Sequence, residues 1–537
     1  MSRKFLNVVL LLIVPCLSAC YDKTAAATEL PNPALDDRPA GSPPELPRAS
    51  VDLPGAPGAA VRVVSSGQNL QRAIDDAKPG DTIALQPGAV FTGSLILREK
   101  VGDGWITIKT NAPDGVFPAP GTRVSPADAR LMPVIESDND SAIRTKGAAH
   151  HYRFIGVEVR PASGVFITNL ILLGDGARSV DALPHHIVFE RSYIHGDPKV
   201  GGRRGIALNA SYAAVVDSYI SDFREERQDS QAICSWNGTG PFAIINSYLE
   251  GAGENVMFGG ADPDILNLVP SDIVLRGNHI AKPLTWRGSP WSVKNLFELK
   301  NARRVLVENN LFEYNWPDAQ NGYSILFTPR NQDGDSPWSM VRDVTFRNNV
   351  VRHVSSGINL LGTDDQHPSQ QTKRILISNN VFDDVSEANW GGLGNLIQIF
   401  NGAVDITIDH NTAFATHAVL VSSGKPNTGV AFTNNLSPSG TYGVGGDSYY
   451  GDPNHALSAY FPGVVFVANV IQGAYANDYP PGNFFPALIT EIGFEDFAGG
   501  DYRLRSDSPY KNAGTDHKDI GADLNSSVPQ PRRRAVR

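Results

Sequence analysis

The sequence of 537 residues contains only three cysteines, Cys16, Cys20 and Cys234, which is too few for a disulfide scaffold of this length. Charged residues make up 19% of the chain, below the roughly 25% that is usual for soluble domains. The formal net charge is -10, so the composition gives no support for a nucleic-acid partner, which needs a broad basic face. The fold must therefore be held by packing and hydrogen bonds.

Glycine and proline are plentiful, with 51 and 38 residues, and they are spread along the chain. This distribution favours many short elements joined by turns. Together with the 41% of hydrophobic residues, it indicates a largely β protein.

The N-terminus has the layout of a secretory signal: Arg3 and Lys4, then an apolar run over residues 5–16, then small residues. The run is too short for a helix that stays in the membrane. The segment Leu17-Ser18-Ala19-Cys20 resembles a bacterial lipobox. That resemblance implies that residues 1–19 are removed and that Cys20 carries lipid, placing the protein on the outer membrane or cell surface. The alternative is an ordinary signal that is cleaved nearby.

Two flanking segments lack apolar periodicity. Residues 20–60 are rich in proline, alanine and acidic residues, and they predict an extended, semi-rigid tether between the lipid and the body. Residues 524–537 form a basic, solvated tail. Between these segments, we expect residues 61–523 to be one domain.

A repeated pattern fills that domain. Two apolar residues alternate, two polar positions follow, and an Asn or Ser comes next with another apolar residue, as in VLVENNLF (305–312) and ILISNNVF (375–382). The marker positions are separated by 24 to 39 residues, and they are Ser192, Ser218, Ser247, Asn278, Asn310, Asn349, Asn380, Asn411, Asn435 and Asn469. Such a period indicates a solenoid.

A second set of strands interleaves with the first, beginning at residues 205, 232, 255, 296, 324, 357, 396 and 418. Two strand sets in step predict an all-β, single-stranded right-handed parallel β-helix. A β-propeller, the alternative, needs about four strands per blade. We expect the asparagines to form a structural ladder that satisfies tight bends along the stack, rather than a metal or sugar site.

Both ends of the array have sequences that could close it. Residues 68–85 place Leu70, Ile74 and Ala77 on one helical face before a strand, which resembles the N-terminal capping helix of pectin-lyase-like β-helices. Residues 501–523 resemble the closing segment of bacterial β-helix enzymes.

Strand alternation predicts a polar strip on one outer face. With Phe297, Leu299, Ile325 and Phe327 directed inward, the outward residues are Leu296, Glu298, Lys300, Leu326, Thr328, Arg330, Asn359 and Gln398. Lys300 and Arg330 should then be neighbours on adjacent rungs. A lysine base and an arginine suit β-elimination in a uronic-acid polymer, where the C5 proton beside a carboxylate is removed.

The stretches ELKNARRVLVENNLFEYN and ILFTPRNQDG resemble the chondroitinase-B and alginate-lyase family of β-helix polysaccharide lyases. The resemblance implies that Lys300 is the base, that Arg330 is the acid, and that Ca2+ is held by acidic and Asn residues, for which Glu298 and Asn295 are the available positions. The chain departs from the family in having Thr-Pro before the arginine and Asn after it.

Two other functions remain open. Glu254 with Asp364 or Asp365 could form the carboxylate pair of a glycoside hydrolase, and Trp236 could stack on a sugar ring. The protein could also bind glycans without catalysis, because a fold does not fix an activity. The pairs His150-His151 and His185-His186 lack the spacing of a strong zinc motif. Overall, we expect a lipid-anchored monomer that acts on extracellular polysaccharide.

Overall fold

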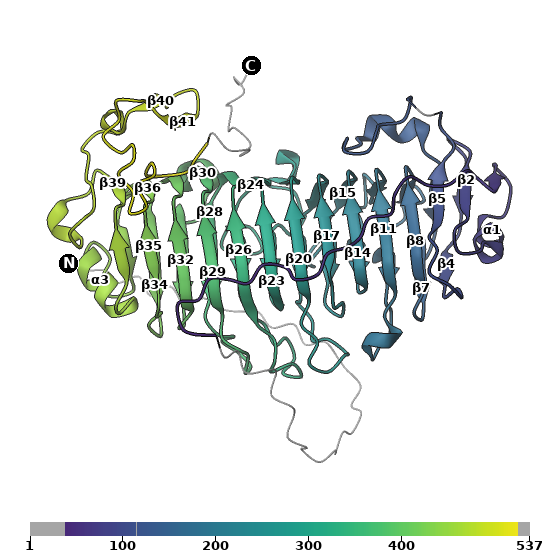
Figure 1. The fold of residues 1–537 in the computed structure, drawn as a ribbon, viewed down its shortest axis with the longest axis horizontal. Helices are drawn as coiled ribbons and strands as arrows, with labels where there is room; N and C mark the ends of the chain where they lie inside the picture. The colour runs from purple at the N-terminus through teal and green to yellow at the C-terminus, as the bar shows by residue number, and fades with distance from the viewer. Residues whose placement is uncertain (1–37, 114, 525–537) are drawn as a thin grey trace, which may run out of the picture. The chain divides into compact units, whose positions relative to one another are not determined.

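A computed structural model describes residues 38–113 and 115–524. Cys20, the signal segment and the basic tail lie outside the described residues. Within them, the chain winds into a right-handed parallel β-helix with three long parallel sheets (Figure 1). None of the helices that the structure describes has the length and hydropathy needed to cross a membrane.

Sheet A contains the strands that carry the repeated pattern. They are β1 (Arg62–Val64), β2 (Thr82–Leu85), β5 (Ile106–Thr110), β8 (His150–Ile155), β11 (His185–Glu190), β14 (Ser211–Val216), β17 (Phe242–Ile245), β20 (Ser271–Arg276), β23 (Ala302–Glu308), β26 (Val341–Arg347), β29 (Lys373–Ser378), β32 (Val404–Asp409), β35 (Ala431–Thr433) and β38 (Val465–Val467).

Sheet B follows directly after each marker residue. Its strands are β3 (Val90–Thr92), β6 (Val134–Ser137), β9 (Glu158–Pro161), β12 (Tyr193–His195), β15 (Tyr219–Phe223), β18 (Tyr248–Gly251), β21 (His279–Ala281), β24 (Leu311–Asn315), β27 (Val350–Val354), β30 (Val381–Val385), β33 (Thr412–Ala415), β36 (Leu436–Pro438) and β39 (Val470–Gln472). The sequence predicted two strand sets and missed this third one, since its strands are short and run on from the pattern of sheet A.

Sheet C corresponds to the second predicted set. Its strands are β4 (Leu95–Arg98), β7 (Ile143–Lys146), β10 (Asn169–Leu173), β13 (Arg204–Leu208), β16 (Gln231–Ser235), β19 (Glu254–Phe258), β22 (Asn295–Leu299), β25 (Tyr323–Phe327), β28 (Ser356–Leu361), β31 (Asn395–Phe400), β34 (Ala418–Ser423) and β37 (Gly443–Gly446).

The asparagine ladder is confirmed. The side chain of each marker accepts the backbone N–H of the marker one coil earlier, as where the Asn310 N–H donates to Oδ1 of Asn349 at 2.9 Å. Serines do the same in the first coils, where the Ser192 N–H donates to Oγ of Ser218 at 3.1 Å. The residue before each marker turns the chain with a positive φ, which is 58° at Asn309. These side chains are therefore structural.

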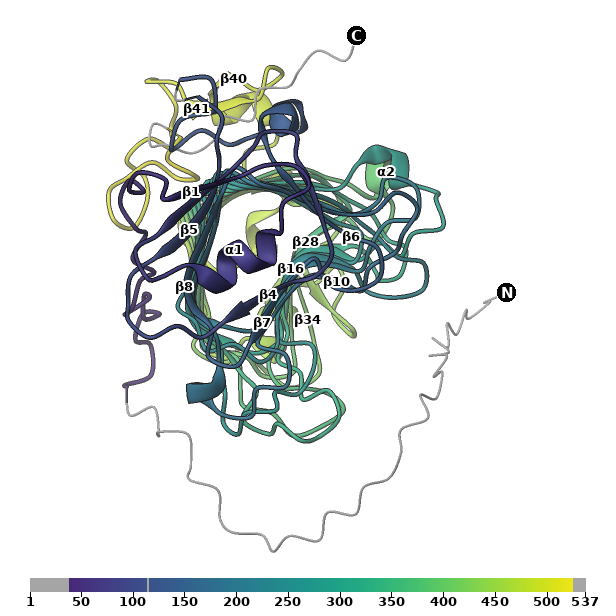
Figure 2. The ribbon, with the colours of Figure 1, turned by 90° about the vertical axis from the view of Figure 1, so that its right-hand side faces the viewer.

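A helix covers the open end of the first coil, as predicted. Helix α1 (Leu70–Asp76) lies across that end (Figure 2), and Leu70, Ile74 and the following Ala77 are buried in the main core. The side chain of Asn69 caps the helix by accepting the backbone N–H of Arg72. The cap keeps the first coil from exposing its apolar interior.

The far end is closed differently from the prediction. Helix α3 (Pro453–Tyr460) follows β37 and buries Ala456 and Leu457 in the main core. The expected closing segment, residues 501–523, contains β41 (Asp501–Leu504), which pairs antiparallel with β40 (Phe494–Asp496). This segment packs on the side of the coil through Tyr502, whose hydroxyl donates to Asp383. Its aromatic side chains need an apolar surface, and the outer side of sheet B provides one.

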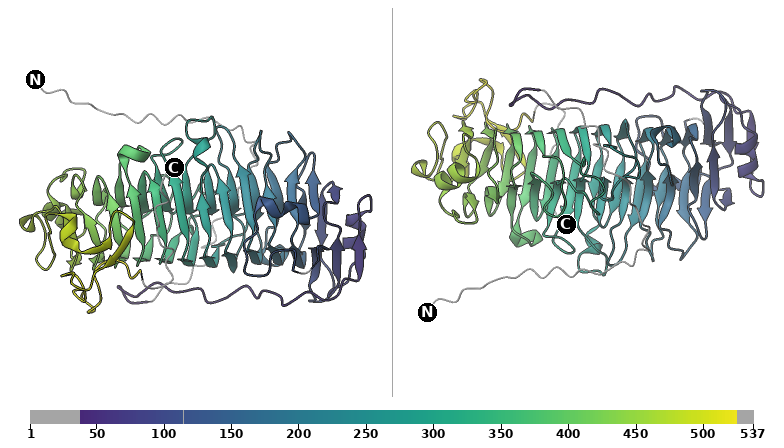
Figure 3. Two further views of the ribbon diagram at one scale, coloured as in Figure 1. Left: turned by 90° about the horizontal axis from the view of Figure 1, so that it is seen from above. Right: turned by 90° about the horizontal axis from the view of Figure 1, so that it is seen from below.

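Residues 38–60 are extended, as expected, but they lie along the outside of sheet A instead of standing apart from the body (Figure 3). Asp343 binds the Arg38 guanidinium, and Asp272 accepts the backbone N–H of Arg48 at 2.8 Å. Arg153 donates to the carbonyl oxygen of Gly55 at 2.6 Å. Over this stretch the predicted tether is thus part of the body.

Candidate functional site

A row of polar side chains crosses the outer face of sheet C at the first residue of successive strands. Arg204, Gln231, Glu254 and Asn295 begin β13, β16, β19 and β22, and the register pairs each with the next. Stacked rungs lie about 4.8 Å apart, so these side chains are direct neighbours. We call these four residues the polar row.

Two carboxylates lie buried in and beside the polar row. Glu254 is fully buried, and its Oε2 accepts from Nε2 of Gln231 at 2.7 Å. Glu298, also buried, accepts from Nδ2 of Asn295 at 3.0 Å. Asn295 and Glu298, the two positions named from the sequence for holding a cation, are therefore in contact, with the amide donating to the carboxylate.

Lysines lie above these carboxylates, nearer to solvent. Lys294 Nζ lies 3.5 Å from Oε1 of Glu254 and also contacts Asp229, and Lys300 Nζ lies 3.4 Å from Oε1 of Glu298. The lysine side chains are 18% and 16% exposed, against 0% and 2% for the two glutamates. Lys294 and Lys300 thus lie nearer to solvent than Glu254 and Glu298, while the Asp229 carboxylate beside Lys294 is 36% exposed.

Burial sets the protonation of this cluster. Burial raises the pKa of Glu254 to about 7, with the neighbouring Asp229 adding to the effect and Lys294 opposing it. Burial also acts to lower the pKa of Lys294, but Glu254 and Asp229 outweigh it and hold that pKa above its ordinary value. Lys294 is therefore a permanent cation at neutral pH.

A fully buried ammonium supports the polar row from below. Lys282 Nζ donates to the carbonyl oxygens of Gly251, Ala252 and Gly253 at 2.7, 2.9 and 3.0 Å, and contacts Oδ1 of Asn255 at 2.8 Å. Burial lowers the pKa of Lys282 to about 7. These bonds fix the backbone that leads into Glu254.

Lys300 and Arg330 lie on adjacent rungs, as the strand parity predicted. The Arg330 N–H donates to the carbonyl oxygen of Lys300 at 2.9 Å. The Arg330 guanidinium binds Oδ1 of Asp364 at 2.7 Å and Oδ1 of Asp365 at 3.1 Å. Both residues border the outer face of sheet C, each beside its own carboxylate partner.

Asp364 holds a loop together. Its carboxylate accepts the backbone N–H groups of Asn331 at 2.7 Å and Gln366 at 3.0 Å, in addition to Arg330. Asp364 follows β28, which lies three strands from the β19 of Glu254. Three rungs span about 14 Å, which exceeds the roughly 5–9 Å between the carboxylates of a glycoside hydrolase. The structure does not bring Glu254 and Asp364 together.

The remaining predicted residues flank this centre. Asn359 and Gln398 are paired in register, with Nε2 of Gln398 donating to Oδ1 of Asn359 at 3.0 Å. The buried Tyr323 donates its hydroxyl to Oε1 of Gln398 at 3.0 Å. At the other end, the half-buried Trp236 lies beneath the Arg204 guanidinium, 5.3 Å from its ring centre. Asn359 and Gln398 thus extend the predicted polar strip on one side of the polar row, and Trp236 lies next to the row on the other side.

One predicted orientation is wrong. Leu296 was expected to point outward, but it is fully buried in the main core together with Phe297. The strand bends at its start, so Asn295 and Glu298 both face outward and strict alternation fails between them.

Sequence reasoning did not single out Arg204, Gln231, Lys282 or Lys294. The polar row could have been found from the sequence, because each of its four residues directly precedes a strand of the second predicted set. Lys282 and Lys294 lie outside those strands, and only the folded loops bring them to Glu254.

Three buried oxygens of the polar row accept no hydrogen bond within the described part of the chain, although Lys294 Nζ lies 3.5 Å from the one on Glu254. They are Oε1 of Gln231, Oε1 of Glu254 and Oδ1 of Asn295, on three consecutive rungs. Carboxylate and amide oxygens are the ligands that Ca2+ prefers. The donor set therefore fits the cation that the sequence resemblance implied, with Glu298 as a further carboxylate.

No protein-family model matches the sequence, and no curated protein matches it. Among solved structures, the catalytic unit of a thermostable GH87 alpha-1,3-glucanase from Streptomyces thermodiastaticus strain HF3-3 is similar with a TM-score of 0.47 and 13% identity, over 77% of this chain and 69% of that chain. The PL6 alginate lyase AlyGC is similar with a TM-score of 0.45 and 13% identity, over 87% of this chain and 57% of that chain.

This chain thus spans little more than half the length of AlyGC. A mannuronic acid specific polysaccharide family 6 lyase from human gut microbiota is similar with a TM-score of 0.43 and 12% identity, over 79% of this chain and 91% of that chain. These likenesses concern the fold alone. By its own architecture, the chain is a right-handed parallel β-helix protein with a polar row on one face of the coil.

Proposed function

We propose that the protein is a polysaccharide lyase that cleaves a uronate-containing glycan by β-elimination. The observation that carries this proposal is the layering of charge on sheet C, where Lys294 and Lys300 face solvent above the buried Glu254 and Glu298. Two cationic side chains on this face can pair with the carboxylates of a uronate polymer, and a neutral glycan has no group that would make the same contact.

The reaction needs one base and stabilisation of negative charge. Lys300, after releasing its own ammonium proton to solvent, takes the C5 proton of the uronate, and the electron pair left on C5 forms the C4–C5 double bond. The bond from C4 to the glycosidic oxygen breaks, and a proton from water completes the leaving hydroxyl. Arg330, on the adjacent rung, stabilises the charge that develops on the substrate or on the leaving oxygen. Lys294, a permanent cation, orients the substrate carboxylate.

We also propose Ca2+ as a cofactor. Asn295 and Glu298 would hold it, together with Oε1 of Gln231 and, in exchange for its contact with Lys294, Oε1 of Glu254. When bound, it would neutralise the substrate carboxylate. If so, a chelator lowers activity and added Ca2+ restores it, whereas the same activity with and without chelator would contradict a calcium requirement.

A glycoside hydrolase remains the second candidate because the pKa of Glu254, about 7, suits a general acid at neutral pH. Its side chain, however, is 0% exposed, and Lys294 lies between it and solvent. A general acid must come within hydrogen-bond distance of the glycosidic oxygen. The geometry therefore favours the lyase. A third candidate, binding without cleavage, would use the same cations.

Product analysis separates the three candidates. The purified body is incubated with alginate, chondroitin sulfate, pectate and a neutral glucan as control. Unsaturated uronides with strong ultraviolet absorbance support the lyase. New reducing ends without that absorbance support the hydrolase, and retention on an anionic glycan without any product supports binding alone.

The lipid anchor is a separate proposal. Cys20, outside the described residues, would be the first residue of the mature chain and would carry acyl groups. Cys20→Ala should then release the protein from membranes into the soluble fraction. Recovery of that variant in the membrane fraction at the wild-type level would contradict the anchor.

A further inference from the structure

Four histidines gather on the outer face of sheet A, on a different sheet from the polar row. His150 and His151 lie at the start of β8, and His185 and His186 lie at the start of β11. Their positions along the chain gave no metal motif. The coil, however, stacks these two rungs directly, since His150 and His185 are register partners.

Each pair presents both rings on the same side of the sheet. Successive strand residues normally face opposite sides, but His151 and His186 have φ values of 57° and 55°, which interrupts that alternation. Nδ1 of His150 lies 2.8 Å from Nδ1 of His151, and Nδ1 of His185 lies 2.7 Å from Nδ1 of His186. Other rungs of sheet A also have a left-handed residue here, such as Asp272 and Arg304, so the turn belongs to the fold. The rungs of Asp272 and Arg304 have different residues at this turn, so, among these rungs, a pair of histidines is present only on β8 and β11.

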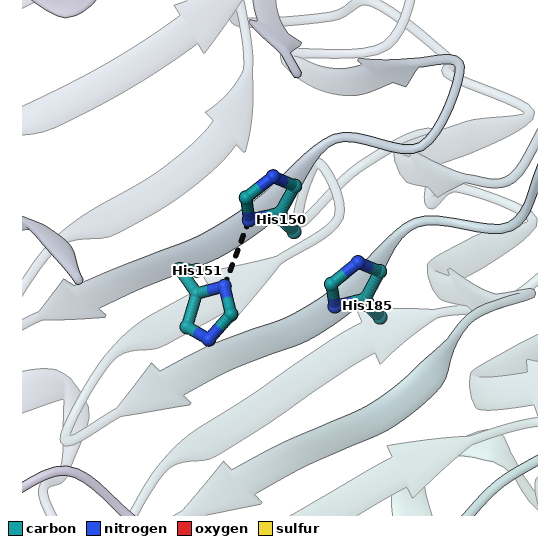
Figure 4. A group of neighbouring side chains, drawn as sticks. All are labelled: His150, His151 and His185. Atoms are coloured by element: carbon teal, nitrogen blue, oxygen red, sulfur yellow. Dashed lines mark hydrogen bonds between the residues drawn. The ribbon is translucent and has the colours of Figure 1, made fainter. Parts of the chain in front are cut away.

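The rings form two parallel stacks. His150 lies over His185 with ring centres 4.8 Å apart, and His151 lies over His186 at 4.4 Å. A hydrogen bond between two ring nitrogens needs one nitrogen without a proton, so at least one ring of each pair is uncharged, and its accepting nitrogen carries the lone pair that a metal ligand needs. One ligand nitrogen from each of His150, His151 and His185 can be chosen so that all three lie within 4.8 Å of one another (Figure 4).

We propose that His150, His151 and His185 form a binding site for a first-row transition-metal cation, with Cu2+ as the favoured ion. Imidazole nitrogens are preferred ligands of Cu2+, Ni2+ and Zn2+. With metal–nitrogen bonds of roughly 2.0–2.1 Å, two ligands at a right angle lie about 2.9 Å apart, and two tetrahedral ligands lie about 3.4 Å apart. The Nδ1 atoms of His150 and His151, hydrogen-bonded at 2.8 Å, are already spaced like two ligands at a right angle, and a bound ion would replace the proton between them. His185 must turn out of its stack on His150 to bring a nitrogen to the same ion.

The surroundings supply a reporter for the bound ion. The Trp105 ring lies edge-on to His151, with ring centres 5.2 Å apart, and 6.1 Å from His186. Cu2+ quenches the fluorescence of a tryptophan in its immediate vicinity. Binding at this site should therefore quench part of the emission of the seven tryptophans, and Trp105→Phe should remove that part without preventing binding.

The test uses protein purified without a polyhistidine tag and stripped of metal. One equivalent of CuSO4 should give an electron paramagnetic resonance spectrum with nitrogen hyperfine coupling, and a titration should reach one Cu2+ per chain at this site. His150→Ala/His185→Ala should weaken that binding by at least about tenfold, since even changes to residues that only hold a metal ligand in place cost about 10 to 100-fold in metal affinity.

His455→Ala is the matched control, because His455 is an exposed histidine beside Asp452 and far from the cluster in sequence. It should bind Cu2+ as the wild type does. Thermal unfolding of the metal-free variants shows whether they fold, and the single change His185→Gln replaces the double variant if that one does not. Equal Cu2+ affinity in the wild type and the cluster variants, or a spectrum without nitrogen coupling, would overturn the proposal.

Discussion

The backbone N–H of Arg330 donates to the carbonyl oxygen of Lys300 at 2.9 Å, which joins the ends of two neighbouring strands of sheet C. This bond fixes the two cationic residues on adjacent rungs. Their side chains then diverge to separate carboxylates, with Lys300 at Glu298 and Arg330 at Asp364. The proposed reaction assigns one proton transfer to Lys300 and charge stabilisation to Arg330, and the variants below separate these roles.

Lys300→Ala should lower the lyase rate by about 10²–10⁴-fold, the usual contribution of a positioned base. Because Lys300 is the ion-pair partner of the buried Glu298, the change should also lower the free energy of unfolding, so urea unfolding first establishes conditions in which the variant is folded. Lys425→Ala, an exposed lysine that follows β34 of the same sheet, is the control and should keep full activity. Equal rates for Lys300→Ala and Lys425→Ala would exclude Lys300 as the base.

Arg330→Lys keeps a positive charge but loses the planar guanidinium that contacts both Asp364 and Asp365. We expect kcat to fall more than KM rises, because the interaction serves the transition state. Steady-state kinetics on the best substrate of the panel give both constants. An increase in KM with unchanged kcat would instead assign Arg330 to substrate binding.

Asp364→Ala should lower stability by about 1–3 kcal/mol, since the backbone N–H groups of Asn331 and Gln366 lose their buried acceptor. Activity should fall only in part, because Asp364 positions Arg330 and its loop and takes no part in the reaction itself. Urea unfolding and rate measurements on the same sample compare the two effects. Complete loss of activity with unchanged stability would favour a catalytic carboxylate at this position.

The stability that protonated Glu254 contributes should be lost as pH rises from about 5 to 7. Burial raises the pKa of Glu254 to about 7, so the folded chain keeps a proton that the unfolded chain has released, and ionising that group costs at most about 3 kcal/mol. Burial also raises the pKa of Glu250 to about 7, which acts in the same direction, and lowers the pKa of His151 and of His185 to about 4, which acts in the opposite direction. The contribution of Glu254 is therefore the difference in slope between the wild type and Glu254→Gln. Urea unfolding at several pH values measures the slope. A slope that is identical in the wild type and in Glu254→Gln would contradict the assignment.

Asn349→Ala should lower the free energy of unfolding by about 2–4 kcal/mol, because the Asn310 N–H and the carbonyl oxygen of Val307 both lose a buried partner. Asn349→Ser should cost less, since serines at Ser218 and Ser247 make the same bond to the preceding coil. Equal losses for the two variants would mean that packing, and not the ladder bond, decides stability at this position.

The fold could be predicted from the sequence because the repeats are regular. Alternating apolar residues and the marker asparagines recur with each coil, and alternation correctly predicted that Phe297 and Leu299 face inward while Glu298 and Lys300 face outward. Leu296 broke the rule because the strand bends at its start, and the third sheet was missed because its strands are short.

The candidate site could be predicted only in part. Glu298, Lys300 and Arg330 follow from strand parity, but the contact of Lys294 with Glu254 depends on a loop that no periodicity describes. Glu254 and Asp364 were paired on the basis of chemistry alone, and the strand order places them on different rungs. The four histidines became neighbours only through the stacking of β8 and β11.

The most direct measurement of the central claim is the mass of the products formed in water enriched in heavy oxygen. Elimination splits the glycan without adding water, so the account predicts an unsaturated fragment whose mass is one water below that of the hydrolysis product, without heavy oxygen at the cleaved bond, and its loss in Lys300→Ala. Fragments that have gained one water containing heavy oxygen, formed equally by Lys300→Ala, would contradict it.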